Sequence, residues 1–256
     1  MRHRFTKYQG AGNDFIIIDN REREFEKSEA VIKRLCDRHF GIGADGMILL
    51  ENDPASDFRM VYYNADGRES SMCGNGGRCI VRYARSLGII KDTAIFSAID
   101  GLHEAFIQSE LVKLRMLDVK EIRKIGDDLI LDTGSPHYIT MREHLDQLEV
   151  KEEGAKIRYS DLFSERGINV NFVSQAGPSE FRVRTYERGV EDETLSCGTG
   201  VTAVAIAMYF SGLAKDNSVI LNTEGGILRV EFEPENDHFK NVYLIGPAEA
   251  VFDGLI

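Results

Sequence analysis

The chain has 256 residues, of which 43% are hydrophobic, and a formal net charge of −11. This length suits one large or two modest globular domains, and the apolar content argues against disorder. The acidic balance, with no basic run longer than two residues, argues against a nucleic-acid partner, because phosphate backbones are bound by basic patches.

The first residues, Met1–Lys7, contain no apolar signal stretch, and no apolar segment is long enough to span a bilayer. We therefore expect a soluble cytoplasmic protein without a membrane partner. The four cysteines (Cys36, Cys73, Cys79 and Cys197) are too few and too scattered for a disulfide scaffold, and no pair has the C-x-x-C spacing of a zinc site. We predict that they remain thiols and that no metal is bound.

Short β-branched runs separated by Asp-Gly and Gly-Gly turns favour antiparallel sheet over βαβ units. In the first half we predict a strand at 15–19, a helix from Ser28 to about Arg38, strands at 47–51 and 58–63, a helix after Cys73, and strands at 94–99, 103–108 and 112–117. In the second half we predict strands at 128–132, 169–174 and 180–186, a helix after Cys197, and strands at 218–222, 227–233 and 241–245. Gly88 and Gly212 mark the ends of the two helices that follow cysteines.

The two halves of the sequence repeat one pattern. An offset of 124 residues (197 − 73 = 124) aligns Cys73 with Cys197 and also aligns the pairs Gly74 with Gly198, Gly76 with Gly200, Gly88 with Gly212, Lys91 with Lys215 and Asp92 with Asp216. We therefore predict an α+β fold of two pseudo-symmetric tandem domains, each a curved, mostly antiparallel sheet wrapped around a central helix. The expected domains are residues 1–118 and 119–256, with the last strand packing back on the first half.

The two repeated helices differ in their polarity. Residues 201–210 are apolar on nearly every face, which predicts a fully buried helix. The first helix has a stripe of Arg78, Arg82 and Arg85, so we expect one side of it to face solvent. Cys36, in the middle of the Ser28 helix, and Cys79 are expected to be core residues.

A cysteine at a helix N-terminus lies beside unpaired N–H groups and the positive end of the helix dipole, which favour a thiolate and bind anions. A lone Cys-Gly turn is more often structural, and two cysteines also suit a redox switch, but their repetition in matching context favours a catalytic pair. Two bases on opposite sides of an amino-acid α-carbon, one thiolate and one thiol, would invert its configuration. No pyridoxal-phosphate setting, phosphate loop or dinucleotide fingerprint is present in the sequence, so we expect no cofactor.

Motifs along the whole chain carry a family resemblance. They are Gly10–Phe15, Gly41–Asp45, Tyr63–Gly67, Met72–Cys79, Pro136-His137, Asn169–Phe172, Glu187–Gly189 and Leu195–Gly200. With these motifs the chain resembles the diaminopimelate epimerase family. The resemblance implies two pseudo-symmetric domains with the site between them, and interconversion of LL- and meso-diaminopimelate in lysine and peptidoglycan precursor synthesis.

The resemblance also implies roles for individual residues. Cys73 and Cys197 are the expected acid/base pair, assisted by His137 and Glu187. The reacting carboxylate would be held by backbone N–H groups of Gly74, Asn75, Gly198 and Thr199, and the rest of the substrate by Asn13, Asn64, Asn171 and Arg188. Family members are commonly dimers, so a homodimer is among the expected states.

Two departures from the family pattern concern substrate contacts: Ser135 stands where an asparagine is usual, and Gly46 where a polar residue is frequent. The alternatives are a two-thiol racemase for another amino acid such as histidine, a non-catalytic amino-acid binder, and a thiol redox sensor. Proline racemase-type enzymes have a histidine at the position of Asn75, and phenazine-type isomerases lack the cysteine pair. Retention of Asn64, Asn171 and Arg188 favours diaminopimelate over histidine.

Overall fold

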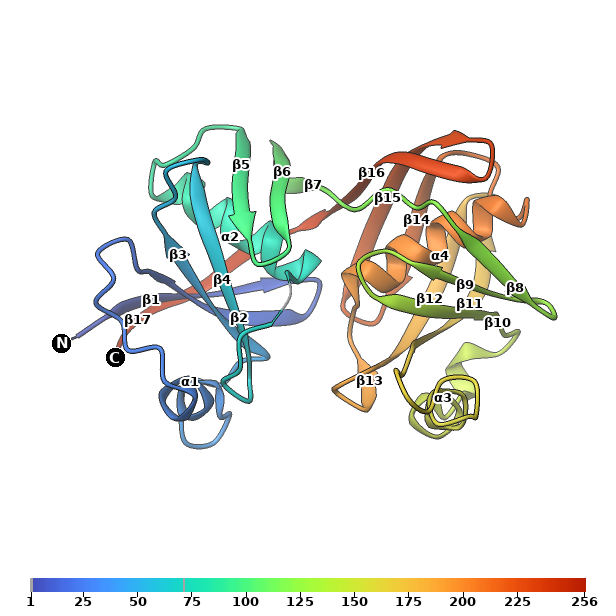
Figure 1. The fold of residues 1–256 in the computed structure, drawn as a ribbon, viewed down its shortest axis with the longest axis horizontal. Coiled ribbons are helices and arrows are strands. Elements are labelled where there is room, and N and C mark those ends of the chain that lie inside the picture. Colours follow the sequence, from blue (N-terminus) through green and yellow to red (C-terminus); the bar gives the residue numbers. More distant parts are fainter. Residues whose placement is uncertain (1, 71) are drawn as a thin grey trace. The chain divides into compact units, whose positions relative to one another are not determined.

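The computed structural model describes residues 2–70 and 72–256. The chain forms two compact units, shown in Figure 1: unit 1 comprises residues 1–114 and 246–256, and unit 2 comprises residues 115–245. The domain division between residues 118 and 119 stays a prediction. Within the described residues, no helix is long and apolar enough to cross a membrane.

Unit 1 is a curved sheet with the strand order β17-β1-β2-β3-β4-β5-β6-β7. These strands are β17 (Glu249–Leu255), β1 (Arg4–Gly10), β2 (Asn13–Asp19), β3 (Gly46–Glu51), β4 (Phe58–Asn64), β5 (Thr93–Ala98), β6 (Gly101–Gln108) and β7 (Leu111–Arg115). Two neighbouring pairs are parallel, β2 with β3 and β4 with β5. Their crossover connections contain α1 (Glu29–Cys36) and α2 (Gly74–Ser86).

Unit 2 repeats this order as β8-β9-β10-β11-β12-β14-β15-β16. Its strands are β8 (Ile122–Ile125), β9 (Asp128–Asp132), β10 (Pro136–Met141), β11 (Asn169–Gly177), β12 (Glu180–Glu187), β14 (Ser218–Thr223), β15 (Gly226–Glu235) and β16 (His238–Pro247). The short strand β13 (Asp192–Thr194) forms a hairpin with β12. The pairs β10–β11 and β12–β14 are parallel. The connection of the first pair contains the 3₁₀ turn Leu145–Gln147 and α3 (Val150–Arg158), and that of the second contains α4 (Gly198–Phe210).

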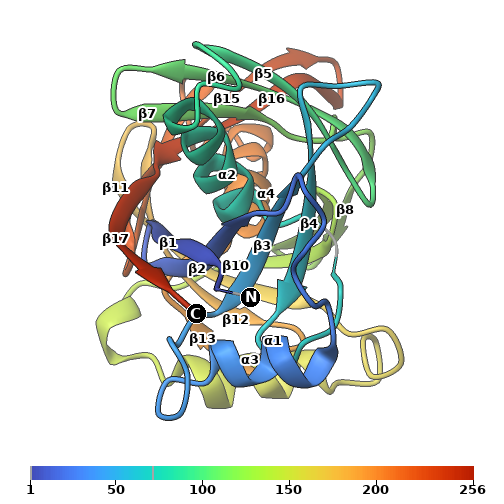
Figure 2. The same cartoon turned by 90° about the vertical axis from the view of Figure 1, so that its left-hand side faces the viewer.

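The last strand of the chain completes the first repeat. In unit 2 the strand next to β9 is β8, which directly precedes it, whereas in unit 1 the equivalent place next to β1 is taken by β17. The chain ends therefore meet: the His3 amide donates to the Ile256 carbonyl at 2.8 Å, and Figure 2 shows the two termini near one another. The first repeat closes only when the C-terminal strand is in place.

Each central helix packs against the sheet of its own unit, as Figures 1 and 2 show for α2 and Figure 1 for α4. Every residue of α4 from Gly200 to Met208 is buried, which confirms the prediction for that part of the helix, but it is wrong at the end, where Tyr209 is half-buried and Phe210 is exposed. In α2 the predicted polar stripe is wrong at Arg78, which is fully buried, while Arg82 is half-buried and Arg85 is exposed. Cys79 is a core residue, as expected.

The α+β class and the mostly antiparallel sheet are confirmed, and among the described residues the pairs β2–β3, β4–β5, β10–β11 and β12–β14 are parallel. The sequence patterns missed β1, β8, β10, β13, β17 and α3. Their sequence signals are weak. β10 begins with proline, and α3 contains a central glycine. In β1 the charged Lys7 has a buried side chain, so the alternation of apolar and polar residues does not follow burial. Cys36 is the last residue of α1 rather than a mid-helix residue.

Candidate active site

Both candidate catalytic cysteines cap the N-terminus of a central helix. Cys73 precedes α2 with φ −95° and ψ 127°, and Cys197 precedes α4 with φ −121° and ψ 114°. In each case the first intrahelical bond accepts at the cysteine carbonyl, from Gly77 at 2.7 Å and from Val201 at 2.9 Å. The N–H groups between each cysteine and that donor therefore have no carbonyl within their own helix to bond.

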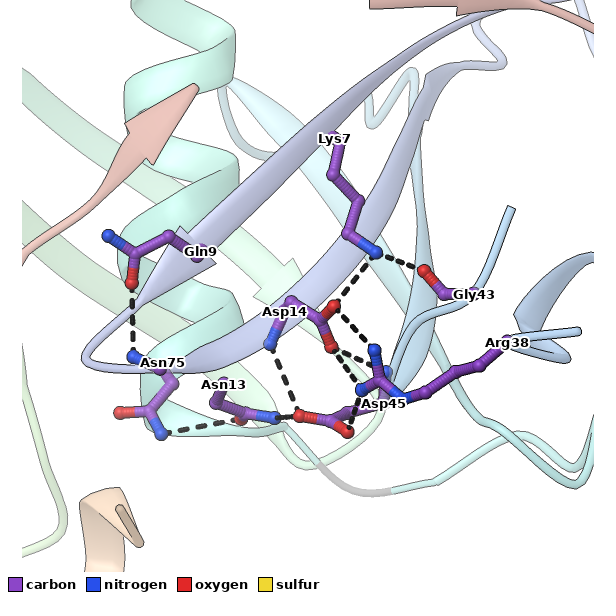
Figure 3. A network of polar contacts seen from close by, with 9 residues as sticks. Lys7, Gln9, Asn13, Asp14, Arg38, Gly43, Asp45 and Asn75 are labelled. Carbon is purple, nitrogen blue, oxygen red and sulfur yellow. Dashed lines mark hydrogen bonds and ion pairs between the residues drawn. The ribbon is translucent and has the colours of Figure 1, made fainter. Parts of the chain in front are cut away.

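In unit 1 the Cys73 thiol faces the side-chain carbonyl of Asn13. The Asn13 Nδ2 donates to Asp45 Oδ2 at 2.6 Å, which fixes the orientation of the amide because a carboxylate only accepts hydrogen bonds. The Asn13 Oδ1 therefore points the other way and accepts from Cys73 Sγ at 3.5 Å and from Asn75 Nδ2 at 3.3 Å. Figure 3 shows Asn13 between Asp45 and Asn75.

A network of charged residues, joined to Asn13 through Asp45, holds it on the side away from Cys73 (Figure 3). Arg38 donates to Asp14 at 2.9 and 3.1 Å and to Asp45 at 2.8 Å, and the buried Lys7 lies 2.8 Å from Asp14. Burial disfavours ionisation of Asp14, but the hydrogen bonds from Arg38 and Lys7 outweigh it and lower its pKa to about 2. The network thereby ties the loop that follows α1 to the start of β2, where Asn13 and Asp14 lie.

Arg78 brings a buried positive charge to the first turns of α2. Its guanidinium donates to the Gly74 carbonyl at 3.3 Å, to Asn75 Oδ1 at 3.0 Å and to the Pro247 carbonyl at 3.3 Å. Burial lowers the pKa of Arg78, and its charge acts on the thiols of Cys79 and Cys73. An arginine remains charged in proteins even so, so this cation is a permanent feature of the first half of the site.

In unit 2 a chain of polar side chains leads to Cys197. The Cys197 Sγ lies 3.5 Å from Thr199 Oγ1, which lies 2.9 Å from His137 Nε2. The His137 Nδ1 lies 3.1 Å from Asn171 Nδ2. His137 is fully buried, and this burial, with the charge of Arg188, lowers its pKa to about 3. The imidazole is therefore neutral at physiological pH.

The repeated glycine of the second helix is required by close packing. A Cβ atom on Gly200 would lie 2.6 Å from Asn171 Oδ1 and 3.3 Å from Cys197 Sγ. No larger residue fits between the cysteine and the buried amide, so Gly200 keeps this part of the site in place.

Arg188 follows β12 and is held through its backbone and its guanidinium. Its amide donates to Asn169 Oδ1 at 2.9 Å, and its guanidinium donates to the Arg166 carbonyl at 3.0 Å and to Ser135 Oγ at 3.3 Å. The Asn169 Nδ2 in turn donates to Ser135 Oγ at 2.9 Å. Beside Arg188, Glu187 accepts from Thr194 Oγ1 at 2.8 Å.

The predicted site residues fall into two groups. Unit 1 brings together Asn13, Cys73, Gly74 and Asn75, and unit 2 brings together His137, Asn171, Cys197, Gly198 and Thr199. Asn64 ends β4 opposite Gly46 and is exposed. Gly46 has no room for the polar side chain that is frequent there, because its Cβ would lie 2.6 Å from the Tyr62 ring.

Sequence reasoning missed three residues that hold the predicted ones. Asp45 orients Asn13, Asn169 joins Ser135 to Arg188, and the Thr185 hydroxyl donates to Asn171 Oδ1 at 3.0 Å. Asp45 and Asn169 both lie within recognised motifs. Their hydrogen-bond partners lie far along the chain, as Asp45 does from Asn13 and Asn169 from Ser135. No local sequence pattern indicates such a pair.

Comparison with known proteins identifies the family. The family model described as "Diaminopimelate epimerase" matches residues 5–116 and 129–251. A diaminopimelate epimerase of Flavobacterium psychrophilum is 56% identical over 252 residues, which cover 98% of each chain. One of Chlorobaculum tepidum is 44% identical, with 96% of this chain and 98% of that protein covered. The chain belongs to the diaminopimelate epimerase family.

Membership in the diaminopimelate epimerase family confirms the resemblance seen in the motifs and makes the chain an isomerase. Solved structures share its fold. A phenazine biosynthesis protein of the PhzF family from Bacillus anthracis aligns with a TM-score of 0.80 at 13% identity, covering 100% of this chain and 99% of that one. A hydroxyproline epimerase from Agrobacterium vitis aligns with a TM-score of 0.72 at 12% identity, covering 100% and 91%.

Proposed function

We propose that this member of the diaminopimelate epimerase family interconverts LL- and meso-diaminopimelate without a cofactor, by moving the α-proton between Cys73 and Cys197. The observation that carries the proposal is the equivalence of the two cysteines: each is the extended N-cap of the buried central helix of its repeat. A cytoplasmic location, expected from the lack of an apolar signal stretch, and a homodimeric state, expected from the family resemblance, remain predictions.

The reaction needs one thiolate and one thiol at the start. The thiolate takes the proton from the α-carbon, whose electron pair is delocalised toward the carboxylate, and the opposite thiol delivers its proton to the other face. One S–H bond forms and the other breaks, so the enzyme ends with the protonation states exchanged. Charge that develops on the carboxylate would be stabilised by the helix N–H groups of Gly74, Asn75, Gly198 and Thr199.

The contacts within each unit refine the roles of the surrounding residues. Asn171 is fully buried and its amide bonds to Thr185, His137 and Tyr138. We therefore assign it to positioning His137 instead of to binding substrate. Arg188 uses two of the five N–H donors of its guanidinium in bonds to described residues, so it can still bind the distal carboxylate, beside Ser135.

The test is exchange of the substrate α-hydrogen, followed by proton NMR in D2O. Wild-type protein should exchange it in both LL- and meso-diaminopimelate and interconvert the two isomers. Cys73→Ala and Cys197→Ala should each lose interconversion by at least a thousandfold while keeping the native circular dichroism spectrum, because either change removes one of the two bases. Cys36→Ala, at the buried end of α1, is the control and should keep full activity.

Other outcomes would support the competing functions. Exchange with histidine but not diaminopimelate would indicate a racemase of another substrate range. Saturable binding of diaminopimelate without exchange would indicate an amino-acid binder. If Cys73→Ala turned over at the wild-type rate, the two-base mechanism would be wrong.

A further inference from the structure

The buried amide of Asn171 has only one orientation that satisfies its neighbours. Its Nδ2 lies 3.2 Å from the Tyr138 carbonyl oxygen, which can only accept a hydrogen bond. Its Oδ1 accepts from the Thr185 hydroxyl at 3.0 Å. Rotating the amide by 180° would face two carbonyl oxygens toward each other in a site shielded from water, so the NH2 group must point toward Tyr138 and His137.

The orientation of Asn171 decides the tautomer of His137. One hydrogen of Asn171 Nδ2 is used by Tyr138, and the other points at His137 Nδ1, 3.1 Å away. His137 Nδ1 must therefore accept, and the ring proton lies on Nε2. Since the imidazole is buried and neutral, Nε2–H donates to Thr199 Oγ1 at 2.9 Å.

A hydroxyl that accepts a hydrogen bond becomes a better donor. The Thr199 hydroxyl, which accepts from His137, has one proton of its own, and Cys197 Sγ is within 3.5 Å. We infer that the chain Asn171–His137–Thr199 directs the Thr199 hydroxyl toward Cys197 and holds this cysteine as the thiolate base of the free enzyme. His137 then acts as a positioning residue that stays neutral, keeps its Nε2 proton and transfers no proton during turnover.

The surrounding charges are compatible with this chain. Glu187 ends β12 and Arg188 follows it, and their opposite charges offset one another. Asp132 on β9 is exposed and accepts from the Gly134 amide at 2.8 Å. The first turn of α4 contains no acidic residue. The N-terminal end of the α4 dipole adds to the stabilisation of a negative sulfur.

The first test observes His137 directly, in substrate-free wild-type protein labelled with 15N-histidine. The inference requires the Nε2–H tautomer for His137, with ring nitrogen shifts that do not change between pH 5 and 9. His137→Gln identifies the signals. A proton on Nδ1, or titration of His137 near pH 6 to 7, would overturn the inference, and both are observed in the wild-type protein.

The second test measures how fast iodoacetamide alkylates Cys197 as a function of pH, with peptide mapping by mass spectrometry. In Thr199→Val the pH midpoint for alkylation should rise by about one unit, because a hydrogen bond to a charged group is lost. Thr199→Ser, which keeps the hydroxyl, should restore the midpoint to within a few tenths of a unit. Thr202→Val is the matched control: it is a buried threonine one turn further along α4 that bonds to the Gly198 carbonyl, and the midpoint should not move.

An equal midpoint in Thr199→Val and wild type would overturn the inference. It rests on the proposed role of Cys197, but the two can fail separately. Both measurements are made without substrate, so a failure here leaves α-hydrogen exchange by the wild-type protein intact. Absence of exchange in a protein that shows the shifted alkylation would instead refute the proposed function.

Discussion

Arg78 and Thr202 occupy equivalent positions in the two repeats, 124 residues apart, and bond to equivalent carbonyls. Arg78 donates to Gly74 O at 3.3 Å, and Thr202 donates to Gly198 O at 2.8 Å. Both acceptors are the first residues of the central helices. The second repeat satisfies this carbonyl with a small hydroxyl, whereas the first uses a buried cation that also reaches Asn75 and the Pro247 carbonyl before β17.

We therefore expect the two positions to differ in their contribution to stability. Arg78→Met removes the side-chain donor of Asn75 Oδ1 and of the Pro247 carbonyl, and the second donor of Gly74 O, which keeps its backbone donor within α2. It also removes a buried cation, and should reduce the free energy of unfolding by roughly 3 kcal/mol. Thr202→Val should cost about 1 kcal/mol or less, because the helix still supplies a backbone donor to Gly198 O. Urea denaturation followed by circular dichroism measures both. Equal losses would show that the Arg78 contacts to Asn75 and Pro247 contribute nothing.

His137 should make the protein less stable toward acid. Its pKa is about 3 when folded and about 6.5 in an unfolded chain, so between these values the unfolded state binds one more proton. Stability is then fully present above about pH 6.5 and falls on acidification by up to about 1.4 kcal/mol per pH unit. Urea unfolding at pH 6.0 and 4.5 should show a smaller pH dependence in His137→Gln than in wild type. His144→Gln, at an exposed histidine, should leave the slope unchanged, and an unchanged slope in His137→Gln would contradict the prediction.

Asp45 should influence catalysis without contacting substrate, because it orients the amide that faces Cys73. In Asp45→Asn the charge-assisted bond to Asn13 is lost and the Asn13 amide is free to rotate. We expect kcat to fall about tenfold or more, since a misplaced catalytic group costs this much, while the circular dichroism spectrum stays native. Asp53→Asn, in the β3–β4 loop where Asp53 bonds to Ala55 and Ser56, should keep wild-type kcat. Wild-type kcat in Asp45→Asn would rule out the positioning role.

The sequence revealed the repeat because the cysteine motifs and helix-ending glycines are local and recur at one offset. It also placed the last strand of the chain against the first half, but it located that strand at 241–245, within β16, and missed β17, the strand that pairs with β1. The pairing of β17 with β1 joins the two chain ends, and no short pattern records such a distant partner. The parallel pairs were missed for a related reason: β2 and β3 contact only after the α1 crossover, and each looks like an ordinary strand by itself.

The sequence located the two cysteines of the proposed site at helix starts, but it did not locate the residues that support them. Cys73 and Cys197 stand at helix starts, where backbone chemistry identifies them. Arg78 was placed toward solvent because arginine is seldom buried, and only the three carbonyl acceptors around it explain the exception. The substrate role of Asn171 was implied by the family resemblance, and the sequence around it does not show whether its amide faces a ligand or a buried histidine.

The distal end of the substrate should decide specificity, through Arg188. Diaminopimelate has a second amino-acid head, and lysine has the same distal amine without the carboxylate. Arg188 is fixed by Asn169, Arg166 and Ser135, so its guanidinium is oriented for a carboxylate before substrate arrives, and a charge-assisted bond left unmade costs roughly 1.5–3 kcal/mol. At about 1.4 kcal/mol per tenfold, kcat/KM for lysine should be lower than for diaminopimelate by about two orders of magnitude, because lysine leaves the oriented guanidinium of Arg188 without its carboxylate. Arg188→Met should remove most of this gap by damaging diaminopimelate turnover far more than lysine turnover.

Ser135→Asn, which introduces the longer side chain usual in the family, should leave the preference for diaminopimelate in place. Comparable kcat/KM values for lysine and diaminopimelate in the wild-type protein would show that Arg188 does not read the distal carboxylate.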